Sequence, residues 1–325
     1  SIRRQRQMCI RDRVHIGEIS AASFNDTIPA KEVWRVSEDG ELRDPFKKLT
    51  TVFQMSEEMF FLHYGKDGCN RHVLIDECRE LFGEIYEQIP ELPFCNIWTA
   101  MQLSSRLPKG ALFHMGVSNT RRCWNMFQLP ESVESACNVG CCGIDGCVST
   151  LVGASLVNPD RLCYVVVGDL TFFYDLNSLG NHHIGTNLRV MLVNNGRGTE
   201  FRLGIHHCNV FGDDADKYMA AAGHFGNKSP LLVKHYAEDL GFHYLSATTK
   251  EEFMTALSNF TNPQLSDHSM ILEVFTDSKD ESEALYLMSH IQSDAKGMVR
   301  SKLKDAVRNV AGEKGINAIK KILKK

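Results

Sequence analysis

The sequence predicts an α/β protein in which helices flank a parallel sheet. Short apolar runs rich in β-branched residues alternate along the chain with stretches of helical periodicity. The runs at residues 111–115, 162–167, 190–193 and 269–275 are nearly continuous in apolar residues, as strands buried on both faces are. The segments between them are long enough for the helical crossovers that join parallel strands.

Length and composition place the chain among soluble globular proteins. It has 325 residues, of which 43% are hydrophobic and 23% are charged, enough for one large domain or two ordinary ones. The net charge of −4 argues against nucleic acid as the main partner. No apolar run is long enough to span a membrane. The eleven cysteines, odd in number and irregular in spacing, suit reduced thiols, so we expect a cytoplasmic protein.

Residues 1–13, SIRRQRQMCIRDR, are unlike the start of a folded domain. They resemble the translated read-through of a sequencing adapter, and the alternative is a short basic tail. If they are an artefact, we expect the natural protein to begin further upstream and this chain to be amino-terminally truncated. We therefore leave them out of the predicted fold.

Residues 14–60 have the pattern of a remnant of a middle α/β domain. Strands are predicted at 14–19 and 32–36, and a glycine-containing turn at 37–40 ends the second. Two strands with so little helix between them cannot close a core of their own. We therefore expect them to belong to a domain whose beginning is not in this chain.

Residues 61–285 are expected to form the main domain. Its first part is mostly helical, and apolar residues recur at helical spacing from Leu74 to Ile89, which predicts one buried helix face. Pro90 and Pro93 end that helix. Further helices are predicted at 96–106, 147–156, 218–222, 232–241 and 249–259, with an additional short strand at 243–247.

Residues 286–325 form a tail of different character. It is rich in Lys and Arg and has apolar residues at helical spacing, which predicts a basic amphipathic helix. Such a helix either docks on its own domain or lies on an anionic membrane surface. We favour docking, so peripheral membrane contact is the less favoured alternative.

The polar residues with the clearest chemical meaning lie between residues 168 and 201. Gly168 and Asp169 follow one buried strand, and Asn194 and Asn195 follow the next. Because ligands bind at the carboxyl ends of strands in an open α/β sheet, these side chains are expected to share a site. Carboxylate and amide oxygens suit magnesium, which commonly shares its coordination with phosphate oxygens. The two strand ends are therefore suited to hold a metal-bound diphosphate.

Two other clusters have ordinary explanations beside functional ones. His182 and His183 lie on or just after a helix, and His206 and His207 lie in a loop after the candidate cofactor segment. The second pair is the better candidate for a catalytic or metal-binding role, although a plain surface role is favoured for both. The four cysteines within 137–147 match no zinc or iron–sulfur spacing, and buried cysteine is a common small core residue.

Five segments carry a resemblance to the thiamine-diphosphate (ThDP) enzymes, whose diphosphate motif runs from GD to NN. They are GDLTFFYDLNSL, NNGRGTEF, GIDGCVSTLVGASL, WRVSEDGELRDPF and HMGVSNTRR. Within that family the chain is most similar to the menaquinone-pathway synthases (MenD). The resemblance implies the ThDP-binding fold, with residues 61–285 as its diphosphate-binding domain.

The same resemblance implies a ligand set for the cofactor. The side chains of Asp169 and Asn195 and the backbone carbonyl of Arg197 would bind Mg²⁺. Gly168 and Leu170 would border the diphosphate of ThDP.

Further residues complete the site that the resemblance implies. Ile144 would support the cofactor in its bent shape, and Phe201 would lie beside it. Arg122, at the end of HMGVSNTRR, matches a substrate-binding arginine. No catalytic residue is expected in this chain, because the glutamate that activates the cofactor comes from a separate pyrimidine-binding domain. That domain would belong to a full-length or partner chain, so we expect a homo-oligomer.

The family reaction is the decarboxylation of a 2-oxo acid and the transfer of the resulting carbanion to an acceptor, which in MenD are 2-oxoglutarate and isochorismate. Val139 stands where the MenD pattern has an arginine, and Glu200 stands where it has an aliphatic residue. These departures suggest another 2-oxo acid. Three hypotheses remain: a truncated transferase or lyase, the ThDP-binding subunit of a two-chain enzyme, and a non-catalytic module that keeps the fold.

Overall fold

In the computed structural model the chain forms two compact units, Ser1–Phe82 and Gly83–Lys325. The structure describes residues 12–16, 30–65, 73–139, 143–203, 206–218, 224–226 and 228–291. Most of the predicted tail at 286–325 therefore lies outside the described residues. Among the helices that are described, none is both long and apolar enough to cross a membrane.

The first unit is a three-stranded parallel sheet followed by a helix. Its elements are β1 (Asp12–Ile16), β2 (Glu32–Val36), β3 (Leu49–Phe53) and α2 (Glu57–Tyr64). The strands lie in the order β1-β2-β3, so both predicted strands are confirmed. The first begins at Asp12 rather than Val14, and the predicted residues 17–19 lie outside the described residues. The sequence did not predict β3, because its partly exposed LTTVF run lacks apolar alternation.

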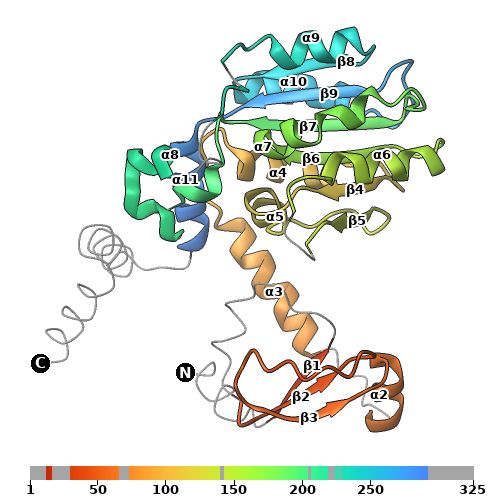
Figure 1. Cartoon of the computed structure of the whole chain (residues 1–325), viewed down its shortest axis with the longest axis vertical. Coiled ribbons are helices and arrows are strands. Elements are labelled where there is room, and N and C mark those ends of the chain that lie inside the picture. The colour runs from red at the N-terminus through yellow and green to blue at the C-terminus, as the bar shows by residue number, and fades with distance from the viewer. Residues whose placement is uncertain are drawn as a thin grey trace, which may run out of the picture. The chain divides into compact units, whose positions relative to one another are not determined.

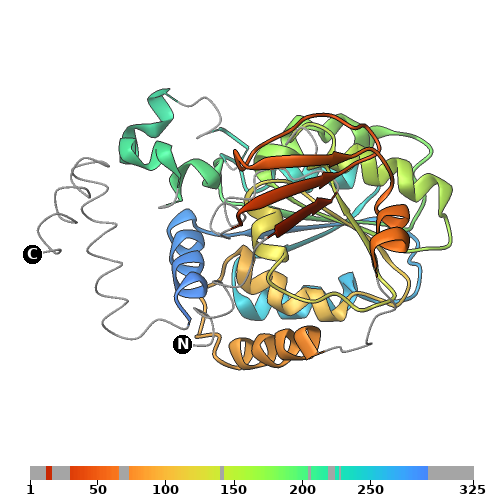
Figure 2. The ribbon, with the colours of Figure 1, turned by 90° about the horizontal axis from the view of Figure 1, so that it is seen from below.

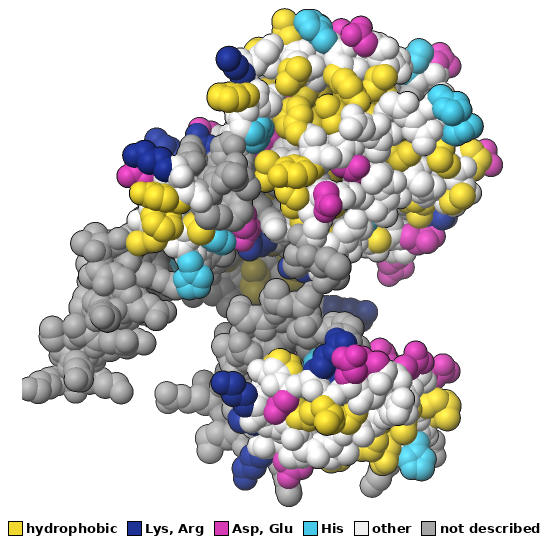
Figure 3. Space-filling view, viewed as in Figure 1, with side chains coloured by type: hydrophobic (Ala, Val, Ile, Leu, Met, Phe, Trp, Pro, Cys, Tyr) yellow, Lys and Arg dark blue, Asp and Glu magenta, His cyan; other side chains and the backbone are white. Residues whose placement is uncertain are grey.

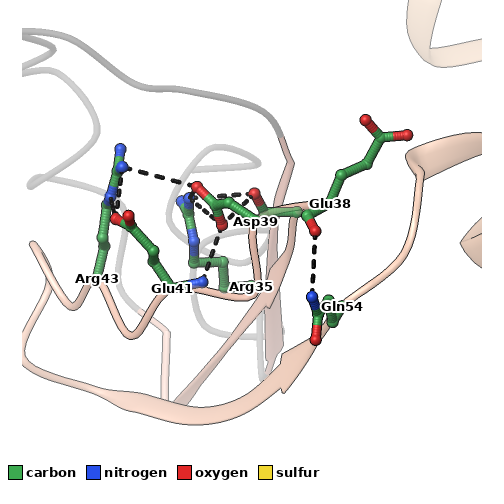
Figure 4. A network of polar contacts seen from close by, with 7 residues as sticks. Arg35, Glu38, Asp39, Glu41, Arg43 and Gln54 are labelled. Carbon is green, nitrogen blue, oxygen red and sulfur yellow. Dashed lines mark hydrogen bonds and ion pairs between the residues drawn. The ribbon is translucent and has the colours of Figure 1, made fainter.

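The predicted turn after β2 is confirmed and is held by a polar network (Figure 4). Arg35 is 1% exposed, and its guanidinium lies 3.3 Å from Asp39 Oδ2. Asp39 Oδ1 accepts hydrogen bonds from the Ser37 hydroxyl at 2.7 Å and from the Glu41 backbone N–H at 2.9 Å. The hydrogen bond from Ser37 is the main reason that the pKa of Asp39 is lowered. Gly40 supplies the positive φ of 63° that the turn requires.

The second unit is built on a six-stranded, fully parallel sheet, as predicted (Figure 1). The strands are β4 (Leu112–Met115), β5 (Glu134–Cys137), β6 (Cys163–Gly168), β7 (Leu188–Asn194), β8 (His243–Ala247) and β9 (Met270–Phe275). Their order is β5-β4-β6-β7-β9-β8. Every residue of β7 is buried, as the apolar run predicted. The edge strand β5 was not predicted, because its ESAC sequence is largely exposed.

Helices cover both faces of this sheet (Figure 2). The described helices that follow α2 in the chain are α3 (Val73–Glu87), α4 (Asn96–Leu103), α5 (Asn119–Trp124), α6 (Cys147–Val157), α7 (Asp169–Tyr174), α8 (Ala215–Tyr218), α9 (Leu232–Asp239), α10 (Lys250–Phe260) and α11 (Ser278–Ser289); those that cover the sheet are α4, α5, α10 and α11 on one face and α6, α7 and α9 on the other. Short 3₁₀ segments are η2 (Ser104–Arg106), η3 (Leu176–Gly180), η4 (Thr199–Arg202) and η5 (His207–Asp214). The predicted helix at 218–222 is described only to Tyr218.

Alternate residues of the central strands separate two hydrophobic cores. On one face, Tyr164 and Val166 of β6 pack with residues of α4, α5, α10 and α11. On the other face, Cys163 and Val165 pack with residues of α6, α7 and α9. This two-sided burial follows from the period of two in a strand and explains the continuous apolar runs.

The apolar face predicted for residues 74–89 is only partly buried. Cys78 is exposed and Phe82 is 38% exposed. Leu81, Ile85 and Ile89 are half-buried, and Ile89 packs against the core of the second unit. Periodicity therefore predicted the helix correctly and its burial in part.

A patch of exposed hydrophobic side chains gathers over α8 and η5 (Figure 3). Val210 is 61% exposed and Tyr218 is 64% exposed, and the rings of Phe211 and Tyr218 lie 4.9 Å apart.

Candidate functional site

A cavity of about 140 Å³ lies at the carboxyl ends of the central strands of the second unit. The loops that follow β4, β6 and β7 supply its walls. The chain runs from β4 to β5 on one side of β4 and returns to β6 on the other side. This reversal of strand order is where an open α/β sheet binds ligands, as the sequence predicted.

Asp169 is the fixed anionic group of this cavity. Its side chain is buried, with 2% exposure. The Oδ1 atom accepts a hydrogen bond from the Leu170 backbone N–H at 2.7 Å. The Oδ2 atom accepts from the backbone N–H groups of Asn195 at 3.2 Å and Arg197 at 3.0 Å. These bonds tie the loops after β6 and β7 to one carboxylate and set its orientation.

The two asparagines after β7 have different surroundings. The Asn194 side chain donates a hydrogen bond to Glu273 Oε1 at 2.7 Å, so it is used inside the fold. The Asn195 Oδ1 atom is buried and has no hydrogen-bond partner among the described residues. An unpaired buried acceptor costs about 1–3 kcal/mol, so such an atom calls for a ligand that the protein itself does not supply.

The residues expected to bind Mg²⁺ lie together. Asp169, Asn195 and Arg197 all line the cavity. No group of three His, Cys, Asp or Glu side chains suited to a metal occurs in the part of the chain that the structure describes. One carboxylate and two neutral oxygens make a set that phosphate oxygens would complete, which is how magnesium is commonly held. The buried, unpaired Asn195 oxygen fits this role.

The expected cofactor-binding residues are largely brought to the same place. Gly168, Leu170 and Ile144 line the cavity with Asp169. Phe201 lies on η4, but its side chain is outside the described residues. Asn96, which the sequence did not single out, also lines the cavity from the amino end of α4.

Arg122 and Glu200 form an ion pair that the sequence analysis did not foresee. The guanidinium donates two hydrogen bonds to the Glu200 carboxylate, at 2.6 and 2.9 Å. Glu200 lines the cavity. Its hydrogen bond is the main cause of the raised pKa of Arg122. The charge of Glu200 is therefore compensated within the protein, and the guanidinium of Arg122 is already engaged.

We expect the Arg122–Glu200 pair to contribute a coupling energy of about 1–3 kcal/mol to folding stability, because it is bidentate and mostly shielded from solvent. The measurement is a double-mutant cycle of Arg122→Ala and Glu200→Ala by urea denaturation. The exposed pair Lys234 and Glu238 provides the matched control and should show weaker coupling. Additive effects at Arg122 and Glu200 would contradict the expectation.

The described residues that line the cavity include neither His182 and His183 nor His206 and His207. The rings of His182 and His183 lie 3.8 Å apart, just after η3. His206 caps η5, where its Nδ1 atom accepts a hydrogen bond from the Cys208 backbone N–H at 3.1 Å. A different histidine, His224, approaches the candidate metal site. No local motif marks it, because its neighbour Asp169 is distant along the chain.

A buried acid lies behind the cavity. Glu281 Oε1 accepts hydrogen bonds from the Asn96 backbone N–H at 2.9 Å and the Thr276 hydroxyl at 2.8 Å. Its other oxygen, Oε2, is buried and has no partner among the described residues. Burial raises the pKa of Glu281 to about 7. The Asn96 side chain in turn accepts a hydrogen bond from Trp124 Nε1 at 3.1 Å.

The class of protein is that of the ThDP-binding fold, with which the parallel sheet, the cavity at its strand ends and the Asp169 and Asn195 side chains that line it are all consistent. The chain is 33% identical over 263 residues to the 2-succinyl-5-enolpyruvyl-6-hydroxy-3-cyclohexene-1-carboxylate synthase of Bacteroides fragilis, covering 79% of this chain and 45% of the relative. It is 32% identical over 265 residues to the synthase of the same name from Phocaeicola vulgatus, covering 79% and 44%. No family model matches the chain.

The synthase of the same name from Bacteroides thetaiotaomicron is also 32% identical, over 259 residues, covering 79% of this chain and 44% of the relative. The chain is therefore a MenD-like member of the ThDP-dependent enzyme family, which confirms the resemblance recognised in the sequence. It spans less than half the length of these curated relatives.

Proposed function

We propose that this chain carries the magnesium- and diphosphate-binding half of the active site of a MenD-like enzyme. The observation that carries the proposal is the buried Asn195 Oδ1 atom without a partner beside the fixed carboxylate of Asp169. A divalent cation would satisfy the first atom and neutralise the second group.

Each residue of the cavity has a role in this proposal. Asp169, Asn195 and the Arg197 carbonyl hold Mg²⁺, and Gly168 and Leu170 border the diphosphate. Ile144 and Phe201 would contact the organic part of the cofactor, and Asp169 would present its carboxylate to the metal from a buried position. ThDP, when bound, supplies the electron sink that permits decarboxylation of a 2-oxo acid.

The proposed reaction is the decarboxylation of a 2-oxo acid and the transfer of the remaining carbon unit to an acceptor. The ion pair between Arg122 and Glu200 supports a substrate other than that of the relatives. An arginine already bound to a carboxylate is less available to a substrate carboxylate. Val139 adds no positive charge at the position where a second arginine is expected.

The proposed active site needs a second domain. The activating glutamate would come from the pyrimidine-binding domain of a full-length or partner chain, most simply in a homo-oligomer. The chain alone would then bind Mg-ThDP weakly and turn over no substrate. One alternative is a ThDP-binding subunit of a two-chain decarboxylase or lyase, which would also require a pyrimidine-binding domain. The other alternative is a non-catalytic module, which would bind no cofactor.

Calorimetric titration of the chain with Mg-ThDP tests the proposal. We expect weak, magnesium-dependent binding, and no carbon dioxide release from 2-oxoglutarate or pyruvate by the chain alone. Adding the pyrimidine-binding domain should strengthen cofactor binding and begin turnover. Binding that is absent even with that domain would support the non-catalytic module, and decarboxylation by the chain alone would contradict the requirement for a second domain.

A further inference from the structure

His224 lies beside the carboxylate of the candidate metal site. Its Nε2 atom is 3.1 Å from Asp169 Oδ2, and its side chain is 16% exposed. The Nε2 atom is buried and makes no well-aligned hydrogen bond with any described residue. The Oδ2 atom of Asp169 is the acceptor that lies within hydrogen-bond distance of it. A separation of 3.1 Å is within hydrogen-bond range, and small rotations of the ring would align the N–H.

The other ring nitrogen identifies the tautomer. His224 Nδ1 accepts a hydrogen bond from the Gly226 backbone N–H at 2.8 Å. An atom that accepts a hydrogen bond carries no proton, so in the neutral ring the proton is on Nε2. A protonated ring nitrogen donates and cannot bind a metal. The geometry therefore makes His224 a donor to Asp169 rather than a metal ligand.

The turn that carries His224 is packed against the helix that begins with Asp169. The His224 ring lies 5.5 Å from the ring of Phe173 in α7. A Cβ atom added at Gly226 would overlap the Phe173 ring, so only glycine permits this approach. The contact places the imidazole at the carboxylate through packing that does not involve a metal.

We propose that His224 is a positioning residue, whose Nε2–H holds the Oδ2 atom of Asp169 and so orients the carboxylate that binds the metal. This inference rests on the proposed function, in which Asp169 is a metal ligand. The Oδ2 atom would then be held by one side-chain and two backbone N–H groups. Groups that hold a ligand in this way typically contribute 10–100-fold to metal affinity.

The test is the affinity for Mn²⁺, which replaces Mg²⁺ and is followed by electron paramagnetic resonance in the presence of ThDP. His224→Phe keeps an aromatic ring against Phe173 but removes the N–H, and we expect about 10–100-fold weaker binding. His224→Gln offers an amide N–H at a similar reach and should stay within about threefold of the parent. The exposed His243→Phe is the matched control and should leave the affinity unchanged.

Two outcomes would overturn the proposal: unchanged or tighter Mn²⁺ binding by His224→Phe, or an equal loss in His224→Gln. Urea denaturation without metal separates a folding defect from a loss of positioning, since both His224 variants should unfold near the parent's midpoint. Nitrogen NMR of the metal-free chain at pH 8 gives an independent readout. An Nε2–H tautomer whose signal moves in Asp169→Asn would support the contact between His224 and Asp169, whether or not the parent binds Mn²⁺. Absence of Mn²⁺ binding by the parent would contradict the proposed function and not this contact. An Nδ1–H tautomer would overturn the inference.

Discussion

Replacing Asp169 with Asn is expected to weaken magnesium-dependent ThDP binding at least 100-fold. The carboxylate is buried and supplies the negative charge that a divalent cation requires. The two carboxylate oxygens together accept three backbone N–H hydrogen bonds. An asparagine keeps only one of these oxygens, and its NH₂ group would face an N–H donor in place of the other. The measurement is calorimetric titration of each variant with ThDP at fixed magnesium.

Three further variants separate metal binding from folding. Asp175→Asn removes a nearby carboxylate that accepts a hydrogen bond from the Ser149 backbone N–H, and it should keep the cofactor affinity. Asn195→Ala removes an oxygen that has no partner in the metal-free protein, so it should lose affinity without losing stability. Asn194→Ala should lose folding stability and keep the cofactor affinity, because the Asn194 side chain donates a hydrogen bond to Glu273 inside the fold. Equal cofactor affinity in the parent and in Asp169→Asn would remove this residue from the site.

The continuous apolar runs made the centre of the fold predictable. Strands β6 and β7 are buried on both faces, and their central residues, 163–167 and 190–193, are continuous apolar runs that indicate buried strands. The polar residues that follow each strand then had to meet at one edge of a parallel sheet. Asp169 and Asn195 were predicted to share a site for that reason, and both line the same cavity.

Other features were not predictable because they depend on tertiary contacts. The edge strand β5 has mostly exposed residues, so burial gives it no periodic pattern. Helix α3 has an apolar stripe, but a stripe does not reveal whether a partner covers it. Arg122 and Glu200 were each singled out, yet their pairing depends on how two loops meet. His224 reaches Asp169 through the packing of its turn on Phe173, which no local pattern encodes.

Replacing Glu281 with Gln is expected to change how folding stability depends on pH. Burial raises the pKa of Glu281 to about 7 in the folded chain, whereas its ordinary value is 4.5. Between these values the folded state holds a proton that the unfolded state has lost. Parent stability therefore falls as pH rises from 4.5 to about 7, and it changes no further above that range through this group. The difference corresponds to roughly 3 kcal/mol.

The glutamine variant lacks this titration. Its oxygen can accept the hydrogen bonds from Asn96 and Thr276, and its neutral amide occupies the place of a neutral acid. The stability of Glu281→Gln relative to the parent should therefore rise by roughly 3 kcal/mol between pH 4.5 and pH 8. Urea denaturation across this range measures the difference, and Glu283→Gln on the exposed side of α11 is the matched control.

A constant difference between the Glu281→Gln variant and the parent at all pH values would show that Glu281 titrates normally in the folded chain. The result also bears on the cavity, because Glu281 binds the backbone of Asn96, which lines it. Ionisation of the carboxylate without the expected loss of stability would mean that water or another polar group compensates the buried charge at Oε2.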